Sequence, residues 1–137
     1  METDDAGHDI EYQAPFARLL DIRSGQTANG IGSVSMVIQD QHRQEAGVVQ
    51  GGIIVTLGDH ALYRAIQSVL EPGENSVTIE LKVNFIAPAR DGELTATARV
   101  ISRGFRIIVG DMEITDSRQR LIARGLGTCL VTRRPSA

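Results

Sequence analysis

Cysteine, tryptophan and long apolar runs are scarce or missing in this 137-residue sequence, and each scarcity excludes a class of protein. The one cysteine, Cys129, has no second cysteine with which to form an internal disulfide, so we expect a reducing, cytoplasmic setting. Aromatic residues make up 4% of the chain, which argues against base stacking on nucleic acid. No apolar run is long enough to cross a bilayer, and the acidic start contains no hydrophobic signal core.

Charge is unevenly distributed along the chain. Five of the 17 acidic residues lie in the first eleven positions, which hold no lysine or arginine. The remainder carries 12 acids against 14 bases, a balance that suits a phosphorylated small molecule but is too weak to indicate nucleic acid. We therefore expect an acidic, flexible arm over residues 1–11 and a single domain over residues 12–137, a length that can bury a core.

Hydrophobic periodicity divides this domain into helices and strands. The helical spacing in "APFARLL" predicts a short helix at about residues 12–20, and the β-branched stretch "GIGSVSMVIQD" predicts a strand ending near residue 40. A polar connection leads to a long apolar helix over about residues 51–70, which "EPGEN" terminates. The period then changes to 2 in "VTIELKVNF", where the apolar residues should share one inward face: Val77, Ile79, Leu81, Val83 and Phe85.

Three more strands follow, in "LTATARVI", "FRIIVGDMEIT" and "QRLIARGLGTCLVT". Four consecutive strands with short connections predict an antiparallel meander. Its apolar face must be covered, and the long helix is the only element large enough to do so. The order of elements therefore predicts an α+β domain in which an antiparallel sheet wraps around one long central helix.

The long helix, in "GVVQGGIIVTLGDHALYRAI", carries a carboxylate, Asp59, at the edge of its apolar surface. Asp59 is either a solvated or ion-paired acid, with Arg64 as a partner, or a desolvated general base or nucleophile. Gly51 and Gly52 stand at the helix N-terminus, where free backbone N–H groups can meet a carbonyl or phosphate oxygen. A donor at one end of the helix and a carboxylate two turns further along would suit acyl transfer.

This stretch resembles the hotdog-fold acyl-CoA thioesterases of the PaaI-like, phenylacetate-pathway type, in the 4-hydroxybenzoyl-CoA thioesterase superfamily. That family's signature runs approximately N-x-x-G-x-x-H-G-G and then places an aspartate eight residues after the first glycine of the pair. Gly47, Gly51, Gly52 and Asp59 match it in order and spacing, whereas Gln44 and Gln50 replace the asparagine and the histidine. The similarity covers roughly residues 14 to 132.

The resemblance implies a hotdog fold and hydrolysis of an acyl-CoA or aryl-acetyl-CoA thioester. It implies that Asp59 acts on water or directly on the thioester, that the Gly51 amide polarises the carbonyl, and that Thr78 helps to position the water. Gln44, Gln50 and Gly52 would contact the substrate. It further implies a homodimer or a dimer of dimers with active sites at the subunit interface, and no cofactor.

Coenzyme A carries phosphates, and Arg90, Arg103 and Arg106 lie at predicted strand ends or turns that could bind them or simply face solvent. Histidines and the cysteine show no metal-ligand spacing, so we expect no metal site. A non-catalytic acyl-CoA-binding protein is the main alternative, because Gln44 and Gln50 depart from the signature. A hotdog dehydratase or a structural subunit is a third.

Overall fold

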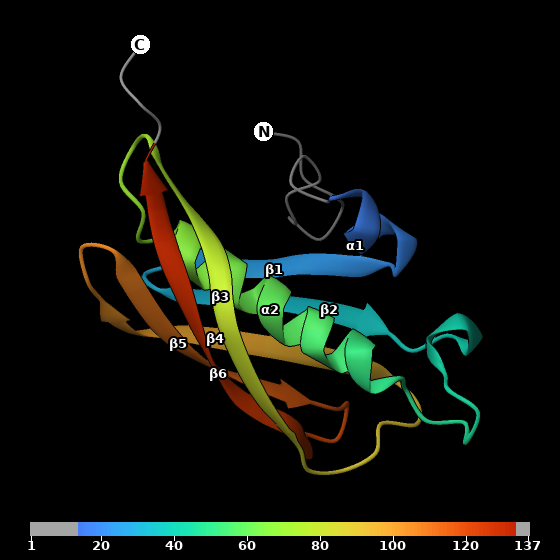
Figure 1. Cartoon of the computed structure of the whole chain (residues 1–137). Helices are drawn as coiled ribbons and strands as arrows, with labels where there is room; N and C mark the ends of the chain where they lie inside the picture. Colours follow the sequence, from blue (N-terminus) through green and yellow to red (C-terminus); the bar gives the residue numbers. More distant parts are fainter. Residues whose placement is uncertain (1–13, 134–137) are drawn as a thin grey trace.

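The computed structural model describes residues 14–133 as a six-stranded antiparallel sheet wrapped around one long helix (Figure 1). In chain order the elements are α1 (Pro15–Leu19), β1 (Ile22–Ala28), β2 (Ile31–Val37), the 3-10 turn η1 (Asp40–His42), α2 (Gly51–Gln67), β3 (Glu74–Phe85), β4 (Glu93–Arg103), β5 (Ile107–Thr115) and β6 (Leu121–Arg133). The α+β class and the single covering helix are confirmed. The acidic arm predicted over residues 1–11 lies outside the described residues.

Small residues let α2 lie close against the sheet. A Cβ atom placed on Gly32 of β2 would stand 2.4 Å from the backbone nitrogen of Ala65 on α2. One placed on Gly127 of β6 would stand 2.4 Å from a methyl carbon of Leu62. Because such distances are shorter than any real carbon contact, only glycine permits this packing, and the helix can bury one face completely. Leu57, Ala61, Leu62, Ala65 and Ile66 are fully buried there.

The strand order differs from the predicted meander. The order across the sheet is β1-β2-β4-β5-β6-β3, so β4, β5 and β6 form consecutive hairpins as expected. The expected pairing of β3 with β4 is wrong: β3 pairs with β6 at one edge, and β2 lies beside β4. Short connections favour neighbouring strands, but here β2 occupies the place beside β4, and β3 crosses over α2 to the far edge.

The prediction also missed β1, the other edge strand. Its sequence "IRSGQTA" buries only Ile22 and Ser24, so it lacks the apolar alternation that identifies a strand. α1 is shorter than predicted over the residues that are described, and α2 ends at Gln67 rather than near residue 70. Terminal turns of helices are weakly specified by sequence, which accounts for these differences.

A β-bulge overturns the predicted face of β3. The register with β6 shifts between Thr78 and Glu80, so Ile79 is the extra residue. Val77 and Ile79 are consequently 50% and 56% exposed, although we expected them to face inward. Phe85, at the end of the strand, is also 56% exposed. Leu81 and Val83 do pack against the core as predicted. The bulge therefore turns Thr78 toward α2.

Candidate active site

Asp59 and Thr78 are brought together by α2 and β3. The Thr78 hydroxyl donates a hydrogen bond of 2.9 Å to Oδ1 of Asp59, and both residues are half-buried. Such a bond satisfies one carboxylate oxygen without a counter-charge and leaves Oδ2 for other partners. Arg64, the basic residue that we considered as a partner, is itself buried and donates to the hydroxyl of Ser24.

Cys129 on β6 completes this group, and sequence reasoning did not place it there. Its Sγ lies 3.6 Å from Oγ1 of Thr78, because Thr78 and Cys129 are direct partners in the β3–β6 ladder. Burial raises the pKa of the Cys129 thiol, a rise that the Thr78 hydrogen bond opposes and the charge of Asp59 adds to. The side chain is therefore a neutral thiol at physiological pH. Only knowledge of the β3–β6 pairing could have identified it.

The N-terminus of α2 presents two glycines at the surface. Gly51 is half-buried and Gly52 is exposed, and the preceding Gln50 has no side-chain capping bond. Among residues 14–133, neither glycine N–H has an acceptor, as expected in the first turn of a helix. A Cβ atom on Gly51 would lie 3.3 Å from the ring of Phe85, so an exposed aromatic ring borders these amides.

Gly51 and Asp59 are far apart within one chain. Eight residues of helix separate them, and at 1.5 Å per residue this corresponds to about 12 Å along the axis. When a thioester carbonyl accepts a hydrogen bond at its oxygen and is attacked at its carbon, the donor nitrogen and the attacking oxygen are only about 7 Å apart. One chain therefore does not place both residues on one thioester.

Gln44 and Gln50 lie in the loop before α2, and both are exposed. The side-chain carbonyl of Gln44 accepts a hydrogen bond from the backbone of Ala46, and this bond stabilises the loop itself. The backbone N–H of Gln50 donates 2.9 Å to the carbonyl of His42. His42, in the connection before α2 that is polar in sequence, is fully buried: Nε2 lies 2.9 Å from the Leu20 carbonyl, and Nδ1 accepts from the Gln39 N–H.

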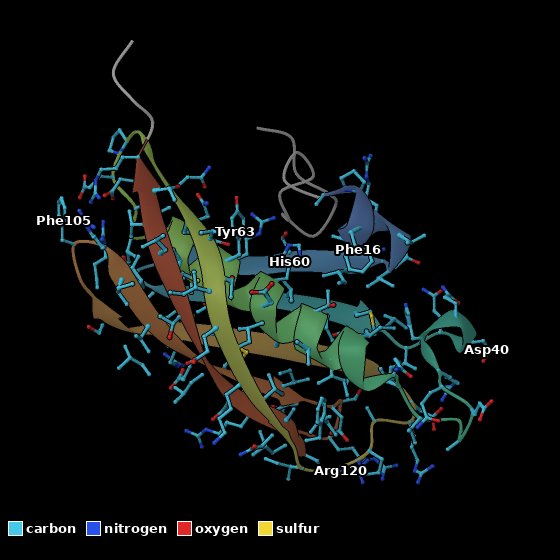
Figure 2. All side chains as sticks on the ribbon, in the orientation of Figure 1. Phe16, Asp40, His60, Tyr63, Phe105 and Arg120 are labelled. Atoms are coloured by element: carbon cyan, nitrogen blue, oxygen red, sulfur yellow. The ribbon has the colours of Figure 1, made fainter. Side chains whose placement is uncertain are left out.

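The three predicted arginines do not converge. Arg90 follows Ala89, whose carbonyl accepts a 2.9 Å bond from Val49, so it lies at the glycine end of α2. Arg103 forms a 2.6 Å ion pair with Glu74, beyond the opposite end of α2. Arg106 is exposed in the same hairpin as Phe105, which Figure 2 places at the other end of the molecule from Asp40.

The turn between β5 and β6 adds two arginines that the sequence did not single out. Arg118 and Arg120 line a surface pocket together with Arg90. Arg120 is held by Asp116 at 2.7 Å, and that carboxylate also accepts the backbone N–H groups of the turn. In the sequence, the turn "DSRQ" carries no pattern that links it to Arg90.

His60 does not act with its neighbour Asp59 as a pair. Burial and the positive charge of Arg64 lower the pKa of His60, and the charge of Asp59 opposes them without reversing the shift. The imidazole is therefore neutral at pH 7. Figure 2 shows His60 and Tyr63 on the side of α2 that points away from β4 and β5.

Within residues 14–133, no three histidine, cysteine, aspartate or glutamate side chains are grouped so that they could hold a metal ion. None of the described helices is both long and apolar enough to cross a membrane.

The wrapped sheet, the glycine pair at the helix start and the aspartate on the same helix define a hotdog-fold protein. Comparison with known proteins gives its family. Residues 46–123 match the Thioesterase superfamily. The chain therefore belongs to the thioesterase superfamily, and by family it is a thioester hydrolase.

Relatives and solved structures agree with this assignment. SSO1253 of Saccharolobus solfataricus, designated an esterase, is 38% identical over 87 residues, which cover 64% of this chain and 57% of that protein. The 1,4-dihydroxy-2-naphthoyl-CoA hydrolase of Listeria monocytogenes is 30% identical over 89 residues, 65% of this chain and 72% of that protein. The E. coli PaaI protein from the phenylacetic acid degradation operon is 26% identical with a TM-score of 0.82, covering 93% of this chain and 90% of that one.

Proposed function

We propose that this protein hydrolyses an acyl-CoA or aryl-acetyl-CoA thioester to the free acid and coenzyme A. The observation that carries the proposal is the half-buried Asp59 carboxylate, oriented by Thr78 and with its second oxygen available. A carboxylate with this orientation can take a proton from water or attack a carbonyl itself. The exposed ring of Phe85 beside Gly51 favours an apolar or aromatic acyl group.

In the water route, Oδ2 of Asp59 accepts a proton as the water oxygen bonds to the thioester carbon. The carbonyl oxygen becomes an oxyanion, which the free N–H of Gly51 stabilises. The tetrahedral intermediate then expels the thiolate, and Asp59 returns the proton to the sulfur. In the alternative route Asp59 attacks directly and water hydrolyses the resulting anhydride. Either route consumes one water and releases acid and thiol.

Two chains are needed for this chemistry, because Gly51 and Asp59 of one helix are too far apart. We infer a homodimer in which the Gly51 amide of one chain faces Asp59 of the other. The open edge of β3, with Val77 and Ile79 about half exposed, is a surface on which a second copy can pair. A dimer of dimers would extend the same assembly.

Phosphate binding falls to the glycine end of the helix in this proposal. Arg90 and Arg118 lie there and line one pocket, so they can reach the coenzyme A phosphates. Arg103, which is paired with Glu74, serves the fold instead. The exposed backbone N–H of Gly52 and the exposed side-chain amides of Gln44 and Gln50 would contact the substrate near its thioester. The single, buried thiol of Cys129 supports a reducing, cytoplasmic setting.

The direct test measures free-thiol release by the purified protein across a panel of acyl-CoA and aryl-acetyl-CoA thioesters. We expect saturable release on at least one member. The panel should include the matching acyl-pantetheine thioesters, which lack the nucleotide phosphates and should show a higher KM at a similar kcat. Thiol release from no member would contradict the proposed hydrolysis.

A non-catalytic acyl-CoA-binding protein is the second candidate, and the use of the Gln44 side chain by its own loop favours it. Substituting Gln50→His restores the family residue at an exposed position. For an active enzyme we expect retained turnover, with at most a change in KM, because either side chain can donate a hydrogen bond. Saturable binding without thiol release in the native protein would indicate a binding protein. Thiol release that appears only in Gln50→His would attribute the missing hydrolysis to Gln50.

A further inference from the structure

The hydrogens around Thr78 determine the direction of a hydrogen-bond chain. A threonine hydroxyl has a single hydrogen, and Thr78 donates it to Oδ1 of Asp59 at 2.9 Å. Cys129 Sγ lies 3.6 Å from the same hydroxyl oxygen. Because the only hydroxyl hydrogen is already used, the thiol must be the donor in this second contact. The chain therefore runs from the Cys129 S–H to Thr78 and from Thr78 to Asp59.

We propose that Cys129 is a positioning residue of the active site, which acts by holding the Thr78 hydroxyl in the rotamer that donates to Asp59. The inference rests on the proposed function, since it assigns Asp59 to the chemistry. Without the thiol, the Thr78 oxygen loses the donor that holds it on this side, so the hydroxyl can leave the rotamer that donates to Asp59 and Asp59 would sample more orientations. Oδ2, the oxygen that reacts, would then be less well aligned with the thioester.

The surroundings of Cys129 make it suited to this role. Its side chain is 2% exposed, and the burial that raises the thiol pKa keeps the donor hydrogen in place across the physiological pH range. Thr78 and Cys129 face each other in the β3–β6 ladder, next to the bulge at Ile79 that turns Thr78 inward. The contact is thus set by the sheet rather than by a mobile loop.

The first experiment compares Cys129→Ala and Cys129→Ser with a matched core variant, Ile108→Val. Ile108 pairs with Cys129 across β5–β6, is fully buried and takes no part in the proposed chemistry. We expect Cys129→Ala to lower kcat about three- to tenfold with KM unchanged, the scale of one modest hydrogen bond. Cys129→Ser, which keeps a donor, should recover at least half of that loss. Ile108→Val should lower the melting temperature without lowering kcat.

A double-mutant cycle tests whether Cys129 acts through Thr78. In the Thr78→Val background, Cys129→Ala should cause no further loss of kcat, since the intermediate residue has gone. An equal loss in both backgrounds, or wild-type kcat in Cys129→Ala, would overturn the proposal.

A spectroscopic readout separates this inference from the proposed function. Cys129 is the only cysteine of the chain, so the S–H stretching band in the infrared spectrum reports it alone. We expect the band at the position of a hydrogen-bonded thiol, moving to higher frequency in Thr78→Val. An unmoved band would overturn the contact whether or not the protein is active. Absence of thiol release by the native protein would contradict the proposed function instead.

Discussion

Asp59 is the residue on which the proposed chemistry depends, and its amide variant separates a catalytic role from a structural one. Asp59→Asn keeps the shape and the acceptor for Thr78 but removes the basic oxygen. We expect thioester hydrolysis to fall by about two to four orders of magnitude. The melting temperature should be unchanged or higher, because a partly desolvated charge has been removed.

Glu80→Gln is the control for this substitution, since Glu80 is an exposed carboxylate on the same strand as Thr78. Both kcat and thermal melting are measured on each variant. Retained turnover together with a lower melting temperature in Asp59→Asn would remove Asp59 from the catalytic role and leave it a structural one.

His60 predicts a pH dependence of stability. Burial, aided by Arg64, lowers its pKa below 6.5, so the folded state favours the neutral ring while the unfolded chain binds a proton near pH 6.5. The stability that depends on neutral His60 is therefore fully present above about pH 6.5 and is lost as the pH falls through the lowered pKa of the folded state. In His60→Asn, the loss of unfolding free energy between about pH 7 and pH 5 should be smaller than in the native protein.

Denaturant unfolding at both pH values gives the comparison for His60. Measuring each protein at pH 7 first removes the pH-independent effect of the substitution. An identical pH dependence in the two proteins would show that His60 does not titrate differently on folding.

At the scale of secondary-structure elements, the approach of α2 to the sheet depends on glycine. Gly32→Ala would place a carbon 2.4 Å from the helix backbone, and neither β2 nor α2 can shift without disturbing the core. We expect a loss of about 2 to 3 kcal/mol in unfolding free energy, or no folded protein. Denaturant titration measures it.

Gly52→Ala is the matched control on the helix itself. A Cβ atom there meets nothing within 4 Å, so stability should be unchanged or should rise by up to about 1 kcal/mol from helix propensity. Equal unfolding free energies of Gly32→Ala and the native protein would show that β2 and α2 leave room for a Cβ atom at Gly32.

At the scale of the whole molecule, complementation tests whether two chains share one site. Gly51→Pro removes the amide hydrogen, and Gln50, with ψ of 132°, has the extended backbone that precedes proline. Gly51→Pro and Asp59→Asn should each be inactive. When they are unfolded and refolded together, mixed dimers should recover activity, because one of their two sites combines an intact Gly51 with an intact Asp59.

Light scattering accompanies this experiment. Ile79→Lys at the β3 edge should lower the mass to that of a monomer and abolish hydrolysis, whereas Val37→Lys, at an exposed apolar position on β2, should do neither. A fully active monomer, or no recovery in the mixed sample, would contradict the shared site.

The sequence by itself determined the elements that carry local patterns. The apolar periodicity of α2 and the alternation in β4, β5 and β6 follow from side chains a few residues apart, and each was predicted. The spacing of Gly51, Gly52 and Asp59 also lies within one helix, so the family resemblance and the candidate carboxylate could be found before any fold was known. Local burial patterns and short motifs are physical properties of the chain itself.

Only the tertiary structure decided how distant segments meet. The crossover of β3 to the β6 edge places Cys129 against Thr78, and the bulge at Ile79 turns Thr78 toward Asp59. Strand pairing and bulges arise from competition between alternative partners for the same backbone hydrogen bonds, and the energies that settle it are sums over the whole core. The approximately 12 Å between Gly51 and Asp59, by contrast, follows from helix geometry, and the proposed homodimer rests on this separation.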